Sequence, residues 1–120
     1  MNKEELNKIK EKALEEHIPI IMDDTLEVIE EYLSKEKPKN FLEIGTAVGY
    51  SAICFTEFLD ENGTIDTIER DLERIKEARE NIKKVGLEDK INIYEGDAVE
   101  ILPTLNKKYD AIFIDAAKGK

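Results

Sequence analysis

The segment from Phe41 to Ser51, FLEIGTAVGYS, constrains the fold more than any other part of this chain. Its first four residues are largely apolar and predict a buried strand, Gly45 begins a tight turn, and Gly49 opens an amphipathic segment. A strand, a glycine-containing loop and a helix in this order are typical of α/β proteins. In such proteins ligands bind where the carboxyl ends of parallel strands meet, so this loop marks a candidate binding site.

The alternation of strands and helices continues along the chain. Strands are predicted at about 41–45, 64–69, 91–95 and 111–114. Helices are predicted at about 3–16, at about 49–59 and near 98–102. Two more are marked by start and stop signals: one opens with a capping box of Asp24 and Glu27 and ends just before Pro38, and the other follows Asp71 and stops at Gly86. We therefore predict an α/β protein with a Rossmann-like, doubly wound parallel sheet in strand order 3-2-1-4 and with N-terminal helices. One domain is expected, with a helical lead-in at 1–37 and the core at 38–120.

Each predicted strand ends in residues that are suited to ligand binding. They are Glu43 and Gly45 at the first strand, Glu69 at the second, Gly96 and Asp97 at the third, and Asp115 at the fourth. Because the carboxyl ends of parallel strands share one edge of the sheet, these residues are expected to converge on a single rim.

The glycine loop lacks the dinucleotide pattern G-x-G-x-x-G, because Ala47 and Tyr50 occupy its second and third glycine positions. A Cβ atom at residue 47 would crowd a pyrophosphate, which counts against a nicotinamide-dependent dehydrogenase. A cofactor that offers an amino-acid head group and a nucleoside suits this loop better. The sequence therefore favours S-adenosylmethionine.

The residues of the loop have predicted roles in holding the methionine part of this cofactor. The backbone N–H groups of Gly45 and Gly49 would bind its carboxylate, aided by the dipole of the following helix. Thr46 and Ser51 would add hydroxyl donors, or would only cap the helix, and the sequence leaves both alternatives open.

Two acidic residues have predicted roles toward the adenosine part. Glu69 would accept hydrogen bonds from the two ribose hydroxyls, and its simpler alternative is a surface carboxylate at a strand end. Asp97 would accept a hydrogen bond from the adenine amino group, or would only cap a helix, since Asp97 and Glu100 have the spacing of a capping box.

Composition restricts the class of protein. A hydrophobic content of 41% and a charged content of 38% are ordinary for a globular domain, and no apolar run approaches the length of a membrane span. The single Cys54 cannot form an internal disulfide, which favours a reducing, cytoplasmic location. A net charge of −10 counts against a broad nucleic-acid interface.

Several motifs together resemble a known family. FLEIGTAVGYSA, TIERD, EGDA and FIDAAKGK, with the lead-in HIPIIMDD, resemble the class I S-adenosylmethionine-dependent O-methyltransferases of the metal-dependent, catechol-methyltransferase-like type. Within that family, IDAAKG is most similar to bacterial enzymes that methylate 5-hydroxyuridine in tRNA. The resemblance covers nearly all of the chain, and its motifs add Met22, Arg70 and Ala98 to the expected cofactor contacts. Packing is the competing explanation for Met22, which lies in an apolar link.

The resemblance also implies a mechanism. In that family a divalent cation, usually Mg²⁺, is held by an aspartate after the fourth strand, which Asp115 matches, and by an Asp-Asn pair further on. A lysine that takes the proton of the substrate hydroxyl or holds its oxyanion is matched by Lys118. Without the resemblance, Asp115 would be assigned to capping a turn and Lys118 to the solvated surface.

Family members continue well beyond their fourth strand, whereas this sequence ends at Lys120. We therefore expect the chain to be an N-terminal portion of a methyltransferase that is inactive by itself and that self-associates, as a homo-oligomer such as a dimer, through its uncovered fourth strand. The expected substrate is tRNA 5-hydroxyuridine or a small catechol-like phenol. A non-catalytic module that only binds the cofactor is the alternative from another functional class.

Overall fold

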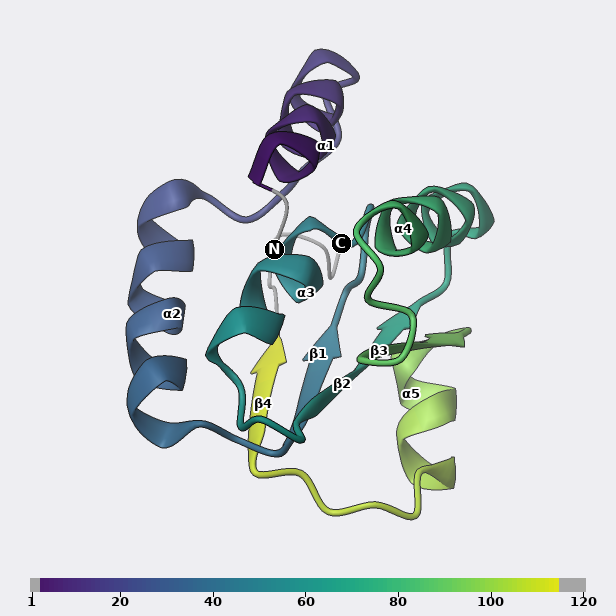
Figure 1. Cartoon of the computed structure of the whole chain (residues 1–120). Helices are drawn as coiled ribbons and strands as arrows, with labels where there is room; N and C mark the ends of the chain where they lie inside the picture. Colours follow the sequence, from purple (N-terminus) through teal and green to yellow (C-terminus); the bar gives the residue numbers. More distant parts are fainter. Residues whose placement is uncertain (1–2, 115–120) are drawn as a thin grey trace.

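A computed structural model describes residues 3–114 of the chain, and the predictions for Asp115 and Lys118 lie outside them (Figure 1). In chain order the elements are α1 (Lys3–Glu15), α2 (Asp23–Glu36), β1 (Asn40–Ile44), α3 (Tyr50–Phe55), the 3₁₀ turn η1 (Thr56–Phe58), β2 (Thr64–Glu69), α4 (Leu72–Lys84), β3 (Ile91–Glu95), α5 (Ala98–Ile101), the 3₁₀ turn η2 (Leu102–Thr104) and β4 (Ala111–Ile114).

The described strands form one parallel sheet in the order β3-β2-β1-β4, as predicted. Strand β1 is central and pairs with β2 on one side and β4 on the other, with Phe41 opposite both Ile65 and Ala111. The chain moves outward from β1 through β2 to β3 and then returns to β4. The reversal therefore lies between β1 and β4, and all four strands present their carboxyl ends at the same edge.

Helix α4 has the start and stop signals that the sequence predicted. The Asp71 carboxylate caps its first turn by accepting hydrogen bonds from the backbone N–H groups of Glu73 and Arg74. At the other end Gly86 has a φ of 71°, and the Leu87 N–H donates to the Ile82 carbonyl at 3.1 Å. This is the hydrogen-bond pattern with which a glycine often ends a helix.

The predicted capping box of α2 is wrong. The helix begins at Asp23, Met22 occupies the N-cap position without a side-chain cap, and the Leu26 N–H donates to the Met22 carbonyl at 2.9 Å. Asp24 therefore lies inside the first turn, where its carboxylate accepts a hydrogen bond from the Thr25 N–H. Its negative charge also interacts favourably with the positive end of the helix dipole.

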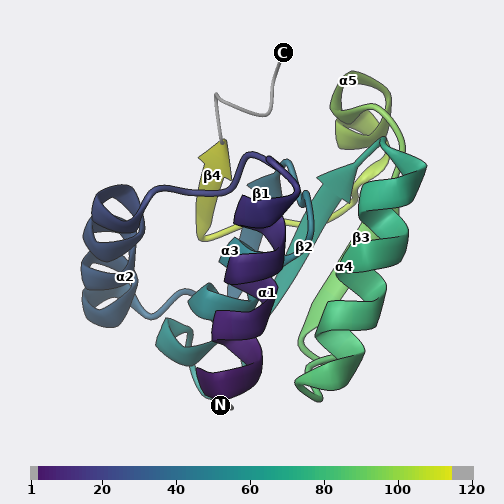
Figure 2. The same cartoon turned by 90° about the horizontal axis from the view of Figure 1, so that it is seen from above.

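The main core lies between the central strands and helix α3, which contacts α1, α2 and α4 (Figures 1 and 2). Phe55 of α3 is fully buried and makes edge-to-face contacts with Phe41 of β1 and Phe113 of β4, at ring-centroid distances of 5.5 and 5.8 Å. None of the described helices has both the length and the apolar character needed to cross a membrane.

The other face of the sheet holds a buried carboxylate that the sequence did not single out. Asp66 in β2 is 1% exposed and accepts hydrogen bonds from the Tyr109 hydroxyl at 2.8 Å, the Lys107 ammonium at 3.2 Å and the Asn92 amide at 3.1 Å. Burial and this acceptor together raise the pKa of Tyr109, so its hydroxyl remains a donor. The cluster attaches the segment before β4 to the middle of the sheet.

Candidate cofactor-binding site

The carboxyl ends of β1, β2 and β3 surround a cavity of about 300 Å³. This volume is at the lower end of the range that is typical of small-molecule sites. Its lining residues come from the three strand ends and the start of α5: Ile44, Gly45, Ile68, Glu69, Arg70, Gly96, Asp97, Ala98 and Val99. The expected convergence of the glycine turn with Glu69 and Asp97 is confirmed.

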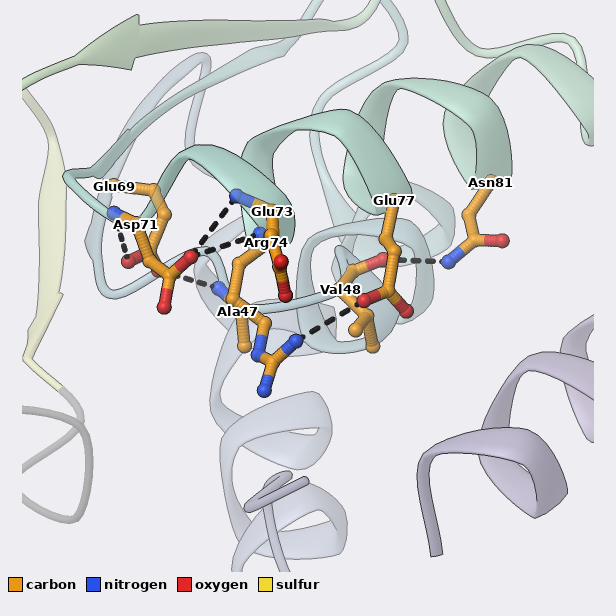
Figure 3. Close-up of polar contacts among 8 residues, drawn as sticks. All are labelled: Ala47, Val48, Glu69, Asp71, Glu73, Arg74, Glu77 and Asn81. Atoms are coloured by element: carbon orange, nitrogen blue, oxygen red, sulfur yellow. Dashed lines mark hydrogen bonds and ion pairs between the residues drawn. The ribbon is translucent and has the colours of Figure 1, made fainter. Parts of the chain in front are cut away.

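Glu69 is the polar centre of this rim. Its Oε1 atom accepts a hydrogen bond from the Ala47 N–H at 2.8 Å, and its Oε2 atom accepts one from the Asp71 N–H at 3.1 Å (Figure 3). Oε2 also accepts from the Arg70 N–H at 3.2 Å. These contacts fix the orientation of the carboxylate at the cavity wall. A carboxylate has about four acceptor sites, so these three contacts leave one on Oε1 for a hydroxyl group, and a second hydroxyl would share or displace a backbone contact.

The loop between β1 and α3 uses its glycine amides within the chain. The Gly45 N–H donates to the Ile68 carbonyl at 2.9 Å, and the Gly49 N–H donates to the Thr46 carbonyl at 2.9 Å. The prediction that these two N–H groups bind a carboxylate is therefore wrong for the loop as it is folded here. Gly49 instead has a φ of 87° and lies against Ala78 of α4, where an added Cβ atom would be 3.4 Å from the alanine Cβ.

Three predicted cofactor contacts form a buried hydrogen-bond network beneath this loop. Glu43 is fully buried and accepts hydrogen bonds from the hydroxyls of Ser51 and of Thr67, the latter at 2.9 Å. The Thr46 hydroxyl is 2.7 Å from the Thr67 hydroxyl. Glu43, Thr46 and Ser51 do not line the rim cavity, and neither hydroxyl caps α3. Their contacts hold the base of the loop.

Asp97 takes the helix-capping role that its sequence position allowed, and it also lines the cavity, where a role toward adenine stays a prediction. Its Oδ1 atom caps α5 by accepting from the Val99 N–H at 2.8 Å, and its Oδ2 atom is 3.6 Å from the Arg70 guanidinium. Arg70 follows β2 and Asp97 follows β3, so this ion pair joins two walls of the cavity. Gly96 beside it continues the strand pairing by donating its N–H to the Glu69 carbonyl at 2.8 Å.

Other predicted site residues lie elsewhere. Met22 is 70% exposed and does not line the cavity, so the structure supports neither the cofactor contact nor the packing alternative. Asp115 and Lys118 lie outside the described residues. Among residues 3–114 there is no group of three or more His, Cys, Asp or Glu side chains that could hold a metal ion. These residues alone do not supply the oxygen ligands that Mg²⁺ requires.

The lone thiol is not part of the rim. Cys54 is 4% exposed in α3, and burial raises its pKa to about 12 despite a hydrogen bond with Tyr50 that acts in the opposite direction. A thiol of this kind stays protonated at neutral pH and is a poor nucleophile.

Sequence reasoning missed several residues that shape the site. Ile44, Ile68 and Val99 supply apolar parts of its wall, and alternation along the strands could have identified the first two. Asn81 of α4 was also missed, although its side-chain amide donates to the Val48 carbonyl at 2.8 Å (Figure 3). A polar residue in an otherwise ordinary helix carries no local signal of such a contact.

Comparison with known proteins identifies the family. The O-methyltransferase family matches residues 2–120. The catechol O-methyltransferase of Niastella koreensis is 42% identical over 84 residues, which cover 67% of this chain and 38% of that protein.

Solved structures agree with this match. The O-methyltransferase from Bacillus cereus in complex with S-adenosylhomocysteine has a TM-score of 0.84 at 28% identity, and the match covers 94% of this chain and 54% of that one. TomG from Streptomyces achromogenes, in complex with S-adenosylmethionine, has a TM-score of 0.83 at 27% identity, with coverage of 94% and 53%. The chain thus spans about half the length of these solved relatives and less than half of the curated one, and over that span it belongs to the O-methyltransferase family.

Proposed function

We propose that this chain binds S-adenosylmethionine in the rim cavity and supplies the cofactor-binding part of an O-methyltransferase. The observation that carries the proposal is the convergence of Gly45, Glu69 and Asp97 on one cavity. Two structural relatives contain S-adenosylmethionine or its product in a matching fold, which supports the same assignment. In this arrangement Glu69 binds the ribose hydroxyls, Asp97 binds the adenine amino group, and Ala98 and Val99 contact the base.

Calorimetric titration of the chain with S-adenosylhomocysteine tests this proposal, with NAD⁺ as the matched control. We expect one binding site per chain for S-adenosylhomocysteine and no heat of binding for NAD⁺. The Ala47 N–H is already bonded to Glu69, so the loop does not offer it to a pyrophosphate. Binding of NAD⁺ in preference to S-adenosylhomocysteine, or of neither compound, would contradict the proposal.

For the whole protein we propose methyl transfer to a hydroxyl of a small catechol-like phenol. The name of the Niastella koreensis relative supports this substrate class, and the net charge of −10 suits a small molecule better than a nucleic acid. The motif IDAAKG favours a second candidate, 5-hydroxyuridine in tRNA. In both cases Asp115 would contribute to a Mg²⁺ site and Lys118 would stabilise or deprotonate the reacting hydroxyl.

A transfer assay with methyl-labelled S-adenosylmethionine and Mg²⁺, with catechol in one arm and hydroxyuridine-containing tRNA in the other, tests both points. The whole protein should methylate catechol and not the tRNA. We expect the 120-residue chain to transfer no methyl group by itself. Turnover in either arm would overturn the proposal that this chain is inactive alone, and it would identify the substrate class directly.

We further propose that 1–37 is a helical lead-in to a core at 38–120, that the protein is cytoplasmic, and that it forms a dimer.

A further inference from the structure

The loop between β1 and α3 is held in part by a residue of α4 that does not line the cavity. The Asn81 side-chain amide donates to the Val48 carbonyl at 2.8 Å, while the Val48 residue itself is 2% exposed (Figure 3). Asn81 lies one turn after Ala78, against which Gly49 packs. The same face of α4 therefore contacts two consecutive residues of the loop.

The other end of the loop is held by Glu69, whose Oε1 atom accepts from the Ala47 N–H at 2.8 Å. Ala47 has a φ of 48°, a conformation that costs free energy for a residue with a Cβ atom and persists only where surrounding contacts maintain it. The peptide group before Ala47 and the second peptide group after it are thus each held by a side chain, Glu69 from the end of β2 and Asn81 from α4 (Figure 3).

We propose that Asn81 is a positioning residue for cofactor binding: through its bond to the Val48 carbonyl it keeps Ala47 in its strained conformation and thereby keeps Glu69 and the glycine turn in place at the rim. The proposal rests on the proposed function, because the ligand of the rim is taken to be S-adenosylmethionine. Asn81 itself makes no contact with that ligand in this account.

The location of the acceptor distinguishes a positioning role from ordinary stabilisation of the helix. The Asn81 amide does not bond to its own helix in this contact but reaches a buried carbonyl 33 positions earlier in the chain. Without the amide, the Val48 carbonyl would lie buried without this donor, and the loop would relax toward conformations that give the carbonyl access to water.

The test compares wild-type protein with Asn81→Ala and the isosteric Asn81→Asp, which replaces the donor by a second acceptor. The matched control is Asn92→Ala, which removes an asparagine hydrogen bond to Asp66 on the other face of the sheet. Two quantities are measured at a temperature where circular dichroism shows every variant to be folded: the exchange rate of the Ala47 amide by NMR and the dissociation constant of S-adenosylhomocysteine.

We expect both Asn81 variants to exchange the Ala47 amide about tenfold faster and to bind S-adenosylhomocysteine about tenfold more weakly, while Asn92→Ala changes neither, since one lost buried hydrogen bond has an effect of this order. Unchanged exchange and affinity in Asn81→Asp would overturn the inference even if Asn81→Ala fails to fold. Failure of the wild-type protein to bind S-adenosylhomocysteine would instead contradict the proposed function, and the exchange rates would still decide whether Asn81 holds the loop.

Discussion

Glu69 shows how one side chain can connect the fold of this chain with its proposed chemistry. Its carboxylate accepts three backbone N–H groups, from Ala47, Arg70 and Asp71, and it also lines the rim cavity. The backbone contacts set its orientation before any ligand arrives. An acceptor that is oriented in advance loses little conformational entropy on binding, which favours affinity.

The first prediction concerns the charge of this residue. Glu69→Gln should weaken S-adenosylhomocysteine binding about tenfold to a hundredfold, because hydrogen bonds to a charged group contribute about 1.5–3 kcal/mol. Titration calorimetry measures the effect. Glu95→Gln is the control, since Glu95 pairs with Glu69 in the sheet register but bonds to Arg79 outside the cavity. Equal affinities for Glu69→Gln and wild type would exclude the ribose role.

The second prediction concerns the buried thiol. Cys54 has a pKa of about 12 in the folded chain, whereas an exposed thiol has one of about 8.5, so only the unfolded state loses this proton between those pH values. The unfolded state is therefore favoured as pH rises. Between pH 7 and pH 10 wild-type protein should lose about 2 kcal/mol more unfolding free energy than Cys54→Ala in urea titrations. Parallel losses in the two proteins would show that the thiol is accessible to water in the folded state.

At the scale of elements, α4 packs against the start of α3 at a glycine, Gly49. Gly49 has a φ of 87° and an added Cβ atom would meet Ala78 at 3.4 Å, a distance of ordinary contact. Gly86 at the end of α4 has a φ of 71° with no neighbouring atom within 4 Å of such a Cβ. The two positions therefore share backbone strain but differ in packing.

The third prediction uses this pair of glycines. Gly49→Ala and Gly86→Ala should each lower the free energy of unfolding by about 1–2 kcal/mol, the cost of a left-handed conformation for a residue with a Cβ atom. Chemical denaturation measures both values. A much larger loss for Gly49→Ala would mean that α3 and α4 cannot accommodate a methyl group between them, and no loss would mean that the loop adopts another backbone conformation.

Sequence patterns were sufficient for the elements of the fold because each pattern reflects a local physical cause. Strand β2 was predicted with its observed bounds, and α4 was predicted from its Asp71 cap and Gly86 stop. The start of α2 was predicted two residues too late, with the N-cap at Asp24 instead of Met22, because Asp24 suits the first turn of a helix as well as its cap.

The candidate site was predictable in its location but less so in its contacts. Parallel strands must bring Gly45, Glu69 and Asp97 to one edge, so their convergence follows from topology alone. Whether a loop N–H faces a ligand or a carbonyl of the chain depends on tertiary packing, which the sequence does not express locally. The bonds from Gly45 to Ile68 and from Asn81 to Val48 are of this kind.

At the scale of the whole molecule, β4 presents apolar side chains to solvent. Ile112 is 58% exposed and Ile114 is 63% exposed, and β4 is an edge strand of the sheet within the described residues. An edge strand with exposed apolar residues favours pairing with another chain. This property belongs to the sheet as a whole, because it arises from the position of β4 in the strand order.

The fourth prediction is that the 120-residue chain associates in solution through this strand. Light scattering should give a mass above that of one chain, and the double substitution Ile112→Lys with Ile114→Lys should reduce it to one chain, since charged side chains oppose edge pairing. Val28→Lys, which changes an exposed apolar residue of α2, should leave the association intact. A monomeric wild-type chain at high concentration would count against an interface at β4.

The ends of β1, β2 and β3 are proposed to bind an adenosyl cofactor together. NMR titration of the ¹⁵N-labelled chain with S-adenosylhomocysteine is the sharpest test of this binding site. We expect the amide shifts to change together around Gly45, around Glu69 and Arg70, and from Gly96 to Val99. Two other cavities, one of about 290 Å³ between α1, α2 and α3 and one of about 260 Å³ beside α4 and β3, should remain unaffected. Shifts centred on either of those cavities, with the rim residues unchanged, would mean that the ends of β1, β2 and β3 do not bind the cofactor.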